Sequence, residues 1–223
     1  YQYYFIKYAP IFVQNIIITI INTRAYYIRR RGGYWDFRRD IRSYSLMSVD
    51  EKKTFVFEKR AAFLECAVSN SAWYKEYNGC ELGEYPVLEK NDLIINIEKM
   101  RARSSKRLVK SSTGGTTGAS MTVYFTESNM QERMAYLDEF RYRHGYELGM
   151  RVAWFSGKDI LGERRNPSVV SRYDYINKIR FYSTFHINNA NFDAYWKSFV
   201  EFQPQYFVGF PSSVYELCEI ALS

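Results

Sequence analysis

The chain has 223 residues, and its composition of 47% hydrophobic, 18% aromatic and 25% charged residues excludes disordered, collagen-like and low-complexity proteins. Three scattered cysteines and two histidines argue against a disulfide framework and a zinc site, and they favour a reducing compartment. Residues 1–46 hold eight basic and two acidic residues, which is +6 of the formal net charge of +7, so the rest of the chain is close to neutral and no broad surface for nucleic acid is predicted.

The first predicted element is a helix that begins near Pro10. Its apolar stretch, residues 11–21, is too short to span a bilayer. Apolar side chains share one face of this helix, namely Val13, Ile17, Ile20 and Ile21, and polar side chains lie on another, namely Asn15, Thr19 and Asn22. Two interpretations stay open. The helix packs on the protein body with Arg29, Arg30 and Arg31 in solvent, or its apolar face and these arginines contact an anionic membrane surface.

A second helix is predicted from a capping-box pattern. Ser48 and Glu51 are spaced to bond each other's backbone N–H groups, and the helix that follows runs to about residue 69. A short helix capped by Asn91 or Asp92 is expected to run to about residue 99. Residues 1–106 are therefore predicted to form an N-terminal helical region.

From Arg107 the pattern changes to short apolar or alternating runs. Five strands are predicted, at residues 108–112, 121–126, 151–155, 179–185 and 206–210. Helical stretches separate them, around residues 130–137, around residues 192–199 and after Pro211. The alternation predicts an α/β fold with parallel strand pairs over residues 107–223. Residues 157–173 are predicted to form a mobile surface loop.

Glycines and hydroxyl side chains are concentrated in residues 110–121, between two predicted strands. Glycines leave backbone N–H groups uncovered, and Thr and Ser hydroxyls add further donors, so such a loop can bind phosphate. A Walker loop is disfavoured because Ala119 and Ser120, rather than Lys and Ser or Thr, follow Gly118. An ordinary hairpin turn without a ligand remains the alternative.

A family resemblance is carried by seven consecutive residues, Ser112-Thr113-Gly114-Gly115-Thr116-Thr117-Gly118. They resemble the phosphate-binding signature of adenylate-forming enzymes, in the form found in the phenylacetate-CoA ligase-like family that includes CapK-type capsule-biosynthesis proteins. Further similar stretches follow the family's order, at Gln14-Asn15, Trp73-Tyr74, residues 85–93 and residues 204–213. The resemblance implies the large domain of an adenylate-forming (ANL-type) enzyme, whose small C-terminal domain and adenylation lysine would lie beyond Ser223.

The resemblance also implies an activity. ATP and Mg2+ would convert a small carboxylic acid into an acyl adenylate, and the acyl group would pass to a thiol such as that of coenzyme A, in a pathway of surface or capsular polysaccharide biosynthesis. Ser112 to Gly118 would hold the ATP phosphates. The acyl pocket would include Trp154, Ser156, Gly157, Gly209, Phe210, Pro211 and Ser212. A plain strand-to-helix turn and a buried tryptophan are the structural alternatives for these positions.

The remaining reactive side chains are interpreted as structural. His144 and His186 are single histidines, and Cys66 and Cys218 lie among apolar neighbours. Asp138-Glu139 is expected on a solvated helix face. We expect a cytoplasmic protein that can contact the membrane at its periphery. The alternative function is a non-catalytic module that docks on a membrane or partner through the N-terminal helix and Arg29, Arg30 and Arg31.

Overall fold

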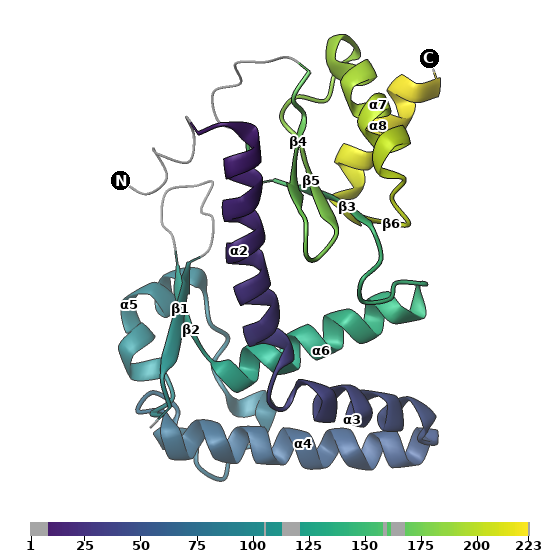
Figure 1. The fold of residues 1–223 in the computed structure, drawn as a ribbon. Helices are drawn as coiled ribbons and strands as arrows, with labels where there is room; N and C mark the ends of the chain where they lie inside the picture. The colour runs from purple at the N-terminus through teal and green to yellow at the C-terminus, as the bar shows by residue number, and fades with distance from the viewer. Residues whose placement is uncertain (1–8, 105, 113–120, 158–159, 162–167, 223) are drawn as a thin grey trace. The chain divides into compact units, whose positions relative to one another are not determined.

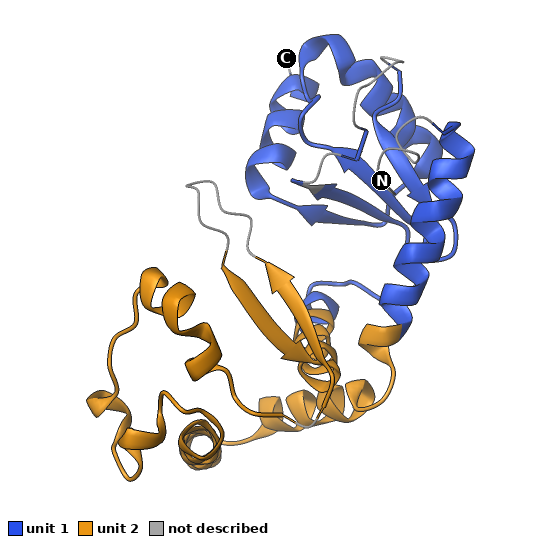
Figure 2. Cartoon of the chain, turned by 90° about the vertical axis from the view of Figure 1, so that its left-hand side faces the viewer, with its two compact units in different colours: residues 1–27, 140–223 blue, residues 28–139 orange. Residues whose placement is uncertain are grey.

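The structure, a computed structural model, describes residues 9–104, 106–112, 121–157, 160–161 and 168–222. The chain forms two compact units, shown in Figure 2: unit 1 comprises residues 1–27 and 140–223, and unit 2 comprises residues 28–139. The first strand begins at Leu108, close to the predicted change of pattern at Arg107. The boundaries of the compact units, at residues 27/28 and 139/140, differ from the predicted division at residues 106/107, because residues near the N-terminus belong to the same unit as the C-terminal sheet.

Unit 1 contains a four-stranded mixed sheet with helices (Figure 1). Its strand order is β4-β5-β3-β6, in which β5 and β6 run parallel to β3 and β4 runs antiparallel to β5. The strands are β3 (Val152–Ser156), β4 (Ser171–Asp174), β5 (Ile179–Ser183) and β6 (Tyr206–Gly209). The helices are α7 (Phe192–Phe202) and α8 (Pro211–Leu222), with a 3-10 turn at Asn189–Asn191 before α7.

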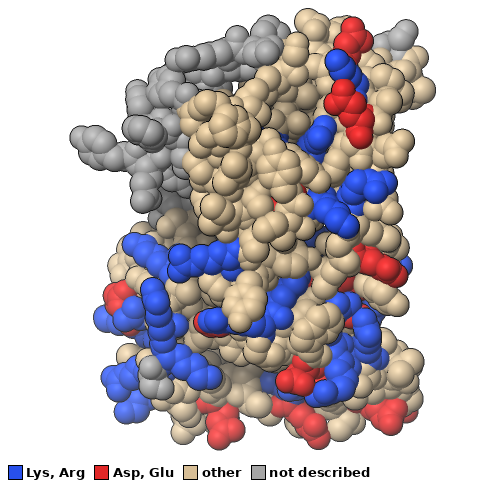
Figure 3. All heavy atoms as spheres, viewed as in Figure 1, with Lys and Arg blue, Asp and Glu red and all other residues tan. Residues whose placement is uncertain are grey.

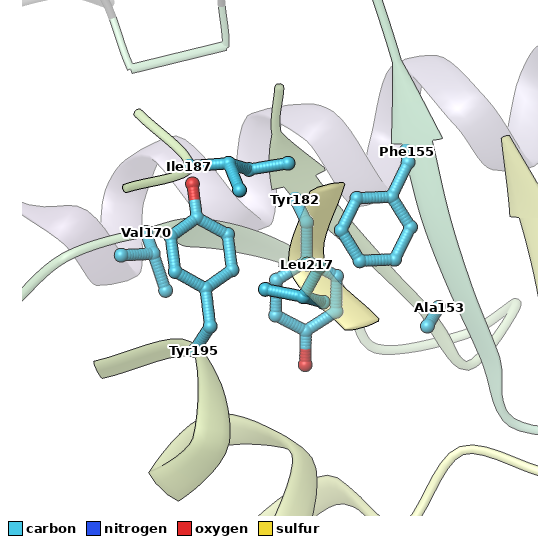
Figure 4. Packing of buried hydrophobic residues seen from close by; sticks show 7 residues of the cluster. All are labelled: Ala153, Phe155, Val170, Tyr182, Ile187, Tyr195 and Leu217. Carbon is cyan, nitrogen blue, oxygen red and sulfur yellow. The ribbon is translucent and has the colours of Figure 1, made fainter. Parts of the chain in front are cut away.

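The two faces of this sheet have separate apolar clusters, because side chains alternate along each strand. On one face Ala153, Phe155 and Tyr182 pack against Tyr195 of α7 and Leu217 of α8 (Figure 4). The rings of Phe155 and Tyr182 are stacked with their centroids 5.2 Å apart. On the other face the intervening side chains form a smaller cluster, which contains Tyr146, Val152, Trp154, Ile179, Phe181 and Val208.

Helix α2 (Ile11–Arg30) lies beside the edge strand β4, as Figure 1 shows. Its polar side chains accept hydrogen bonds from backbone N–H groups of that edge: Asn15 Oδ1 from Tyr173 N at 3.0 Å, and Thr19 Oγ1 from Tyr175 N at 3.0 Å. Gln14 Oε1 accepts from the buried Arg172 side chain at 2.6 Å. These contacts satisfy groups that an open sheet edge leaves unpaired.

The helix therefore packs through the face opposite to the one that hydrophobicity favours. Gln14 and Thr19 are buried, whereas of the predicted apolar face Ile20 and Ile21 are exposed and Val13 and Ile17 are half-buried. The predicted packing of this helix on the body is confirmed, but the packing face is its polar one. The part of that interpretation that placed all three arginines in solvent is wrong for Arg30, which is 10% exposed and pairs with Asp138. The polar face packs because the backbone N–H groups at the edge of β4 need hydrogen-bond acceptors, and isoleucine side chains have none.

Unit 2 consists of helices and a two-stranded hairpin. Its helices are α3 (Tyr34–Leu46), α4 (Val49–Asn70), α5 (Lys90–Met100) and the part of α6 (Glu127–Arg143) up to residue 139, with 3-10 turns at Lys75–Tyr77 and Leu82–Glu84. Gly32, with a φ of 55°, lies in the break between α2 and α3. The strands β1 (Leu108–Ser112) and β2 (Thr122–Thr126) pair antiparallel.

Several predicted boundaries can be checked against the described residues. The capping box at Ser48 is confirmed: Ser48 N donates to Glu51 Oε2 at 2.7 Å, and Glu51 N donates to Ser48 Oγ at 3.3 Å. Helix α5 starts earlier than predicted, since Glu89 is its cap and Asp92 accepts from the Glu89 backbone N–H. The surface loop predicted to extend to Tyr173 is wrong at its end, because residues 171–173 belong to β4.

We expect the Thr19→Val substitution, which preserves side-chain shape, to lower the free energy of unfolding by about 1–2 kcal/mol, because the Tyr175 N–H loses its acceptor. Urea unfolding measures the loss, and hydrogen exchange at the Tyr175 amide should become faster. The control is Ile20→Thr on the exposed face of the same helix, which should change stability by less than about 0.5 kcal/mol. Equal effects of the two substitutions would contradict the packing face described here.

Candidate functional site

The predicted phosphate-binding stretch begins where strand β1 ends. Ser112 is the last residue of β1 and pairs with Thr122, the first residue of β2. The prediction that strands flank this stretch is confirmed by the antiparallel pairing. The other predicted phosphate ligands lie outside the described residues, namely Thr113, Gly114, Gly115, Thr116, Thr117 and Gly118.

Basic side chains lie along the hairpin. The Arg101 guanidinium is 4.9 Å from the ring centre of Tyr124, and the Arg133 guanidinium is 4.7 Å from that of Phe125. Both rings belong to β2, and Lys110 of β1 pairs with Tyr124 in the strand register. Arg101 also pairs with Glu98 at 2.9 Å, so its charge is offset locally, and Lys110 and Arg133 are the cations along the hairpin that could attract an anion.

The segments predicted for the acyl pocket meet at one edge of the sheet in unit 1. Because β3 and β6 are parallel, Ser156-Gly157 and Phe210 leave their strands on the same side. A Cβ added to Gly157 would lie 3.1 Å from a carbon of the Phe210 ring. The carboxyl ends of parallel strands are where α/β proteins most often bind ligands. The structure thus brings these two predicted segments into contact.

Gly209 makes this arrangement possible. It lies opposite Phe155 in the β3–β6 register, and a Cβ added to it would lie 2.6 Å from the Phe155 Cβ and 2.8 Å from the Phe155 carbonyl oxygen. Side chains do not approach so closely, so any residue other than glycine would push β6 away from β3. The close approach of the two strands therefore explains the glycine at position 209 without any bound ligand.

The first turn of α8 follows directly. Phe210 is 58% exposed, Pro211 and Ser212 are exposed, and the Phe210 carbonyl accepts from Ser213 N at 3.1 Å. Trp154 differs from these residues, since its ring packs in the second apolar cluster, 5.9 Å from the Phe181 ring, with the Arg141 guanidinium 5.3 Å from the tryptophan ring. Trp154 accordingly has a packing role on that sheet face.

One contact at the same edge was not predicted. Ser183, the last residue of β5, pairs in register with Ser156, and its Oγ lies 2.7 Å from His186 Nδ1. The Ser183 Oγ also accepts from Phe185 N at 3.3 Å, and its carbonyl accepts from the Tyr195 hydroxyl. The spacing of three residues between Ser183 and His186 is the sequence signal for this contact. Ser183 is fully buried, so the pair fixes the turn after β5 rather than offering a nucleophile.

The three arginines predicted to contact a membrane or another anion have different surroundings. Arg30 forms a two-pronged ion pair with Asp138, with N–O distances of 2.7 and 3.1 Å, and its side chain is 10% exposed. Arg31 pairs with Glu127 at 2.8 Å and is about half-exposed. Arg29 is exposed, and no ion pair of the described residues includes it. Among the described helices, none combines the length and hydrophobicity that crossing a bilayer requires.

The expectation of a solvated face for Asp138 and Glu139 is wrong. Both carboxylates are buried. Asp138 accepts from Arg30 and from the Tyr34 hydroxyl at 2.8 Å. Glu139 accepts from Arg38 and Arg42, and although burial raises its pKa, these hydrogen bonds outweigh burial and lower the pKa below its ordinary value. Partners about 100 positions away in the sequence neutralise both charges, and helix periodicity cannot reveal them.

We expect Gly209→Ala to lower the free energy of unfolding by about 1–3 kcal/mol, because the added methyl group overlaps Phe155. The matched control is Gly83→Ala, since an added Cβ at Gly83 meets nothing within 4 Å, and its effect should stay within about 1 kcal/mol. Urea unfolding measures both variants. A Gly209→Ala variant as stable as the parent would show that β6 does not approach β3 this closely.

Tyr34 supports a prediction at alkaline pH. Burial, followed by the charge of Asp138, raises the pKa of its hydroxyl to about 12. A raised pKa stabilises the fold below the ordinary value of about 10, and this contribution is lost as the pH rises from about 10 through 12. Tyr34→Phe should cost about 2 kcal/mol at pH 8, and its deficit relative to the parent should shrink between pH 10 and 12.

Urea unfolding across this pH range measures the deficit. The exposed Tyr136, on α6 in the same unit, provides the control. Tyr136→Phe should follow the parent at every pH, and a Tyr34→Phe deficit that stays constant up to pH 12 would contradict the assignment.

Comparison with known proteins gives one distant similarity. The chain is 24% identical over 225 aligned positions to Protein CapK of Staphylococcus aureus. The alignment covers 98% of this chain and 50% of the relative, so the chain spans about half the length of the curated relative that it matches. No protein-family model matches the chain. No solved structure matches it either.

Proposed function

We propose that the protein takes part in ATP-dependent activation of a carboxylic acid for surface or capsular polysaccharide biosynthesis. The observation that carries the proposal is the hairpin β1–β2, which joins its two strands through the glycine- and threonine-rich stretch that starts at Ser112. The similarity to Protein CapK, which extends over nearly the whole chain, supports the same proposal.

The proposed reaction has two steps. A carboxylate oxygen of the acid attacks the α-phosphorus of ATP, the bond to the outer two phosphates breaks, and pyrophosphate leaves as the acyl adenylate forms. A thiolate, such as that of coenzyme A, then attacks the acyl carbon and releases AMP. The first step needs the outer phosphates to be held in line and their negative charge offset.

The chain's own groups suit the first of these tasks. The hydroxyls of Thr113, Thr116 and Thr117 and the backbone N–H groups of the glycines between them are donors for phosphate oxygens. Mg2+ bound to the phosphates would supply further neutralisation. The cations of Lys110 and Arg133 along the hairpin add positive charge on the strands that lead into the stretch, whereas Arg101 is paired with Glu98.

The carboxyl edge of the sheet in unit 1 is the proposed site for the acid. The ring of Phe210, which is 58% exposed, lies against Gly157, and Ser212 lies in the first turn of α8, where helix N–H groups lack intrahelical acceptors. An apolar acyl chain or ring would pack against Phe210. Trp154 is a less direct candidate because its ring is packed against Phe181.

ATP–pyrophosphate exchange with a panel of carboxylic acids, carried out on the full-length protein, tests the proposal. At least one acid should support exchange, and a Thr116→Ala/Thr117→Ala variant should reduce its rate by about 100-fold, because donors to the phosphates are lost. The matched control is Ser111→Ala, an exposed strand residue next to the stretch, which should retain the parent rate. A folded parent protein without exchange for any acid would contradict the proposal.

A further inference from the structure

Helix α4 is unusual because it buries no side chain. All 22 of its residues are described, and none of them is buried. Four of its large apolar residues, Val49, Val56, Phe57 and Phe63, are exposed, and Phe63 is 70% exposed, whereas Phe55, Leu64 and Val68 are half-buried. Helices within proteins gain most of their stability from packing an apolar face, so an exposed apolar face on a long helix suggests a binding surface.

The charges of α4 are separated between two faces. Val49, Val56 and Phe63 lie seven positions apart and therefore share one face. Helical geometry places every basic residue of α4 beside this apolar row, namely Lys52, Lys53, Lys59 and Arg60. Three acidic residues lie on the other side, namely Glu51, Glu58 and Glu65. Asp50 lies at the border between the two sides and pairs with Lys53 at 3.1 Å. Figure 3 shows acidic side chains along the lower margin of the molecule, where Figure 1 draws α4.

A groove lies on the apolar and basic face. It has a volume of about 480 Å³ and is lined by Val49, Val56 and Phe57 of α4 and by Tyr44 of α3. Lys52, Lys53 and Arg60 complete its lining. The groove thus offers apolar contact area bordered by cations, and none of its lining residues is acidic.

We propose that this face of α4, consisting of Val49, Lys52, Lys53, Val56, Phe57, Lys59, Arg60 and Phe63, binds the surface of a membrane that contains anionic phospholipids. The apolar side chains enter the boundary between headgroups and acyl chains, and Lys52, Lys59 and Arg60 contact the phosphates, while Lys53 pairs with Asp50 at the border of the face. This combination of an apolar row with basic flanks matches the surface of helices that lie in the plane of a membrane interface.

The charge pattern favours a lipid surface over other partners. A nucleic acid would use the basic residues but would gain little from Val56 and Phe63, which are exposed on the same face. A second copy of the chain packed on this face would bring four cations from each copy together, and repulsion between like charges disfavours that contact. The proposal is independent of the catalytic one and also of Arg29, Arg30 and Arg31.

Co-sedimentation with vesicles tests the proposal. The protein should bind vesicles of phosphatidylglycerol and phosphatidylcholine, and should not bind phosphatidylcholine alone. Raising salt from 0.1 to 1 M shortens the screening length from about 10 to about 3 Å and should release most of the bound protein. Lys59→Glu/Arg60→Glu should lower the partition coefficient at least about twentyfold. Val56→Ala/Phe63→Ala should lower it about tenfold, because apolar burial is lost.

Two control variants separate this surface from others. Glu58→Gln/Glu65→Gln, on the acidic face of the same helix, should bind at least as well as the parent. Arg29→Ala should bind like the parent. Circular dichroism and thermal unfolding verify that all variants keep the parent fold.

Three results would overturn the proposal. The first is equal binding to neutral and anionic vesicles, or binding to neither. The second is a loss of binding in the Arg29→Ala variant but not in the α4 variants. The third is evidence for another partner on this face. Binding of single-stranded nucleic acid that depends on Lys59 and Arg60 but not on Phe63 would indicate a nucleic acid. A dimer in analytical ultracentrifugation that Val56→Ala/Phe63→Ala abolishes would indicate a second copy of the chain.

Discussion

The open edge of strand β4 is the constraint on which unit 1 depends. A sheet of four strands leaves two edges with unpaired backbone groups, and an uncovered edge invites pairing with other chains. Here the acceptors come from one side of helix α2, with Asn15 and Thr19 placed four residues apart so that they reach alternate N–H groups of the strand. The helix is thereby held by hydrogen bonds along the edge, and Ile16, Ile20 and Ile21 are left exposed.

In unit 2, buried carboxylates rather than backbone N–H groups need partners. Asp138 and Glu139 are neighbours on α6, and both are buried, so each needs cationic partners to offset the cost of leaving water. Arg30 serves Asp138, and Arg38 and Arg42 serve Glu139. Removing one partner would leave a buried charge, so such pairs select one way of packing α3 on α6 even where an apolar contact would be equally stable.

The elements that depend on local sequence patterns could be predicted from the sequence. The capping box of α4, the five strands that were predicted and the parallel pairing of β3 with β5 and β6 all follow from spacing and alternation. The sequence was a poor guide where a distant partner decides. Periodicity shows which side chains of α2 share a face, but the choice of face depends on β4. That strand was not predicted, because three of its four residues were assigned to the loop at residues 157–173. The burial of Asp138 depends in the same way on Arg30.

The same distinction applies to the candidate site. Gly209 is required by its close approach to Phe155, a contact between strands that are 54 positions apart in register, so its presence in a recognisable motif does not by itself indicate a ligand. Ser112 marks the end of an antiparallel pair that would form with any suitable turn, so the glycines and threonines after it are not needed for pairing alone. Hydroxyls in that number exceed what a hairpin turn requires, which favours the proposed phosphate binding. The stretch after Ser112 in unit 2 is therefore a stronger candidate for a functional site than the turn at Gly209 in unit 1.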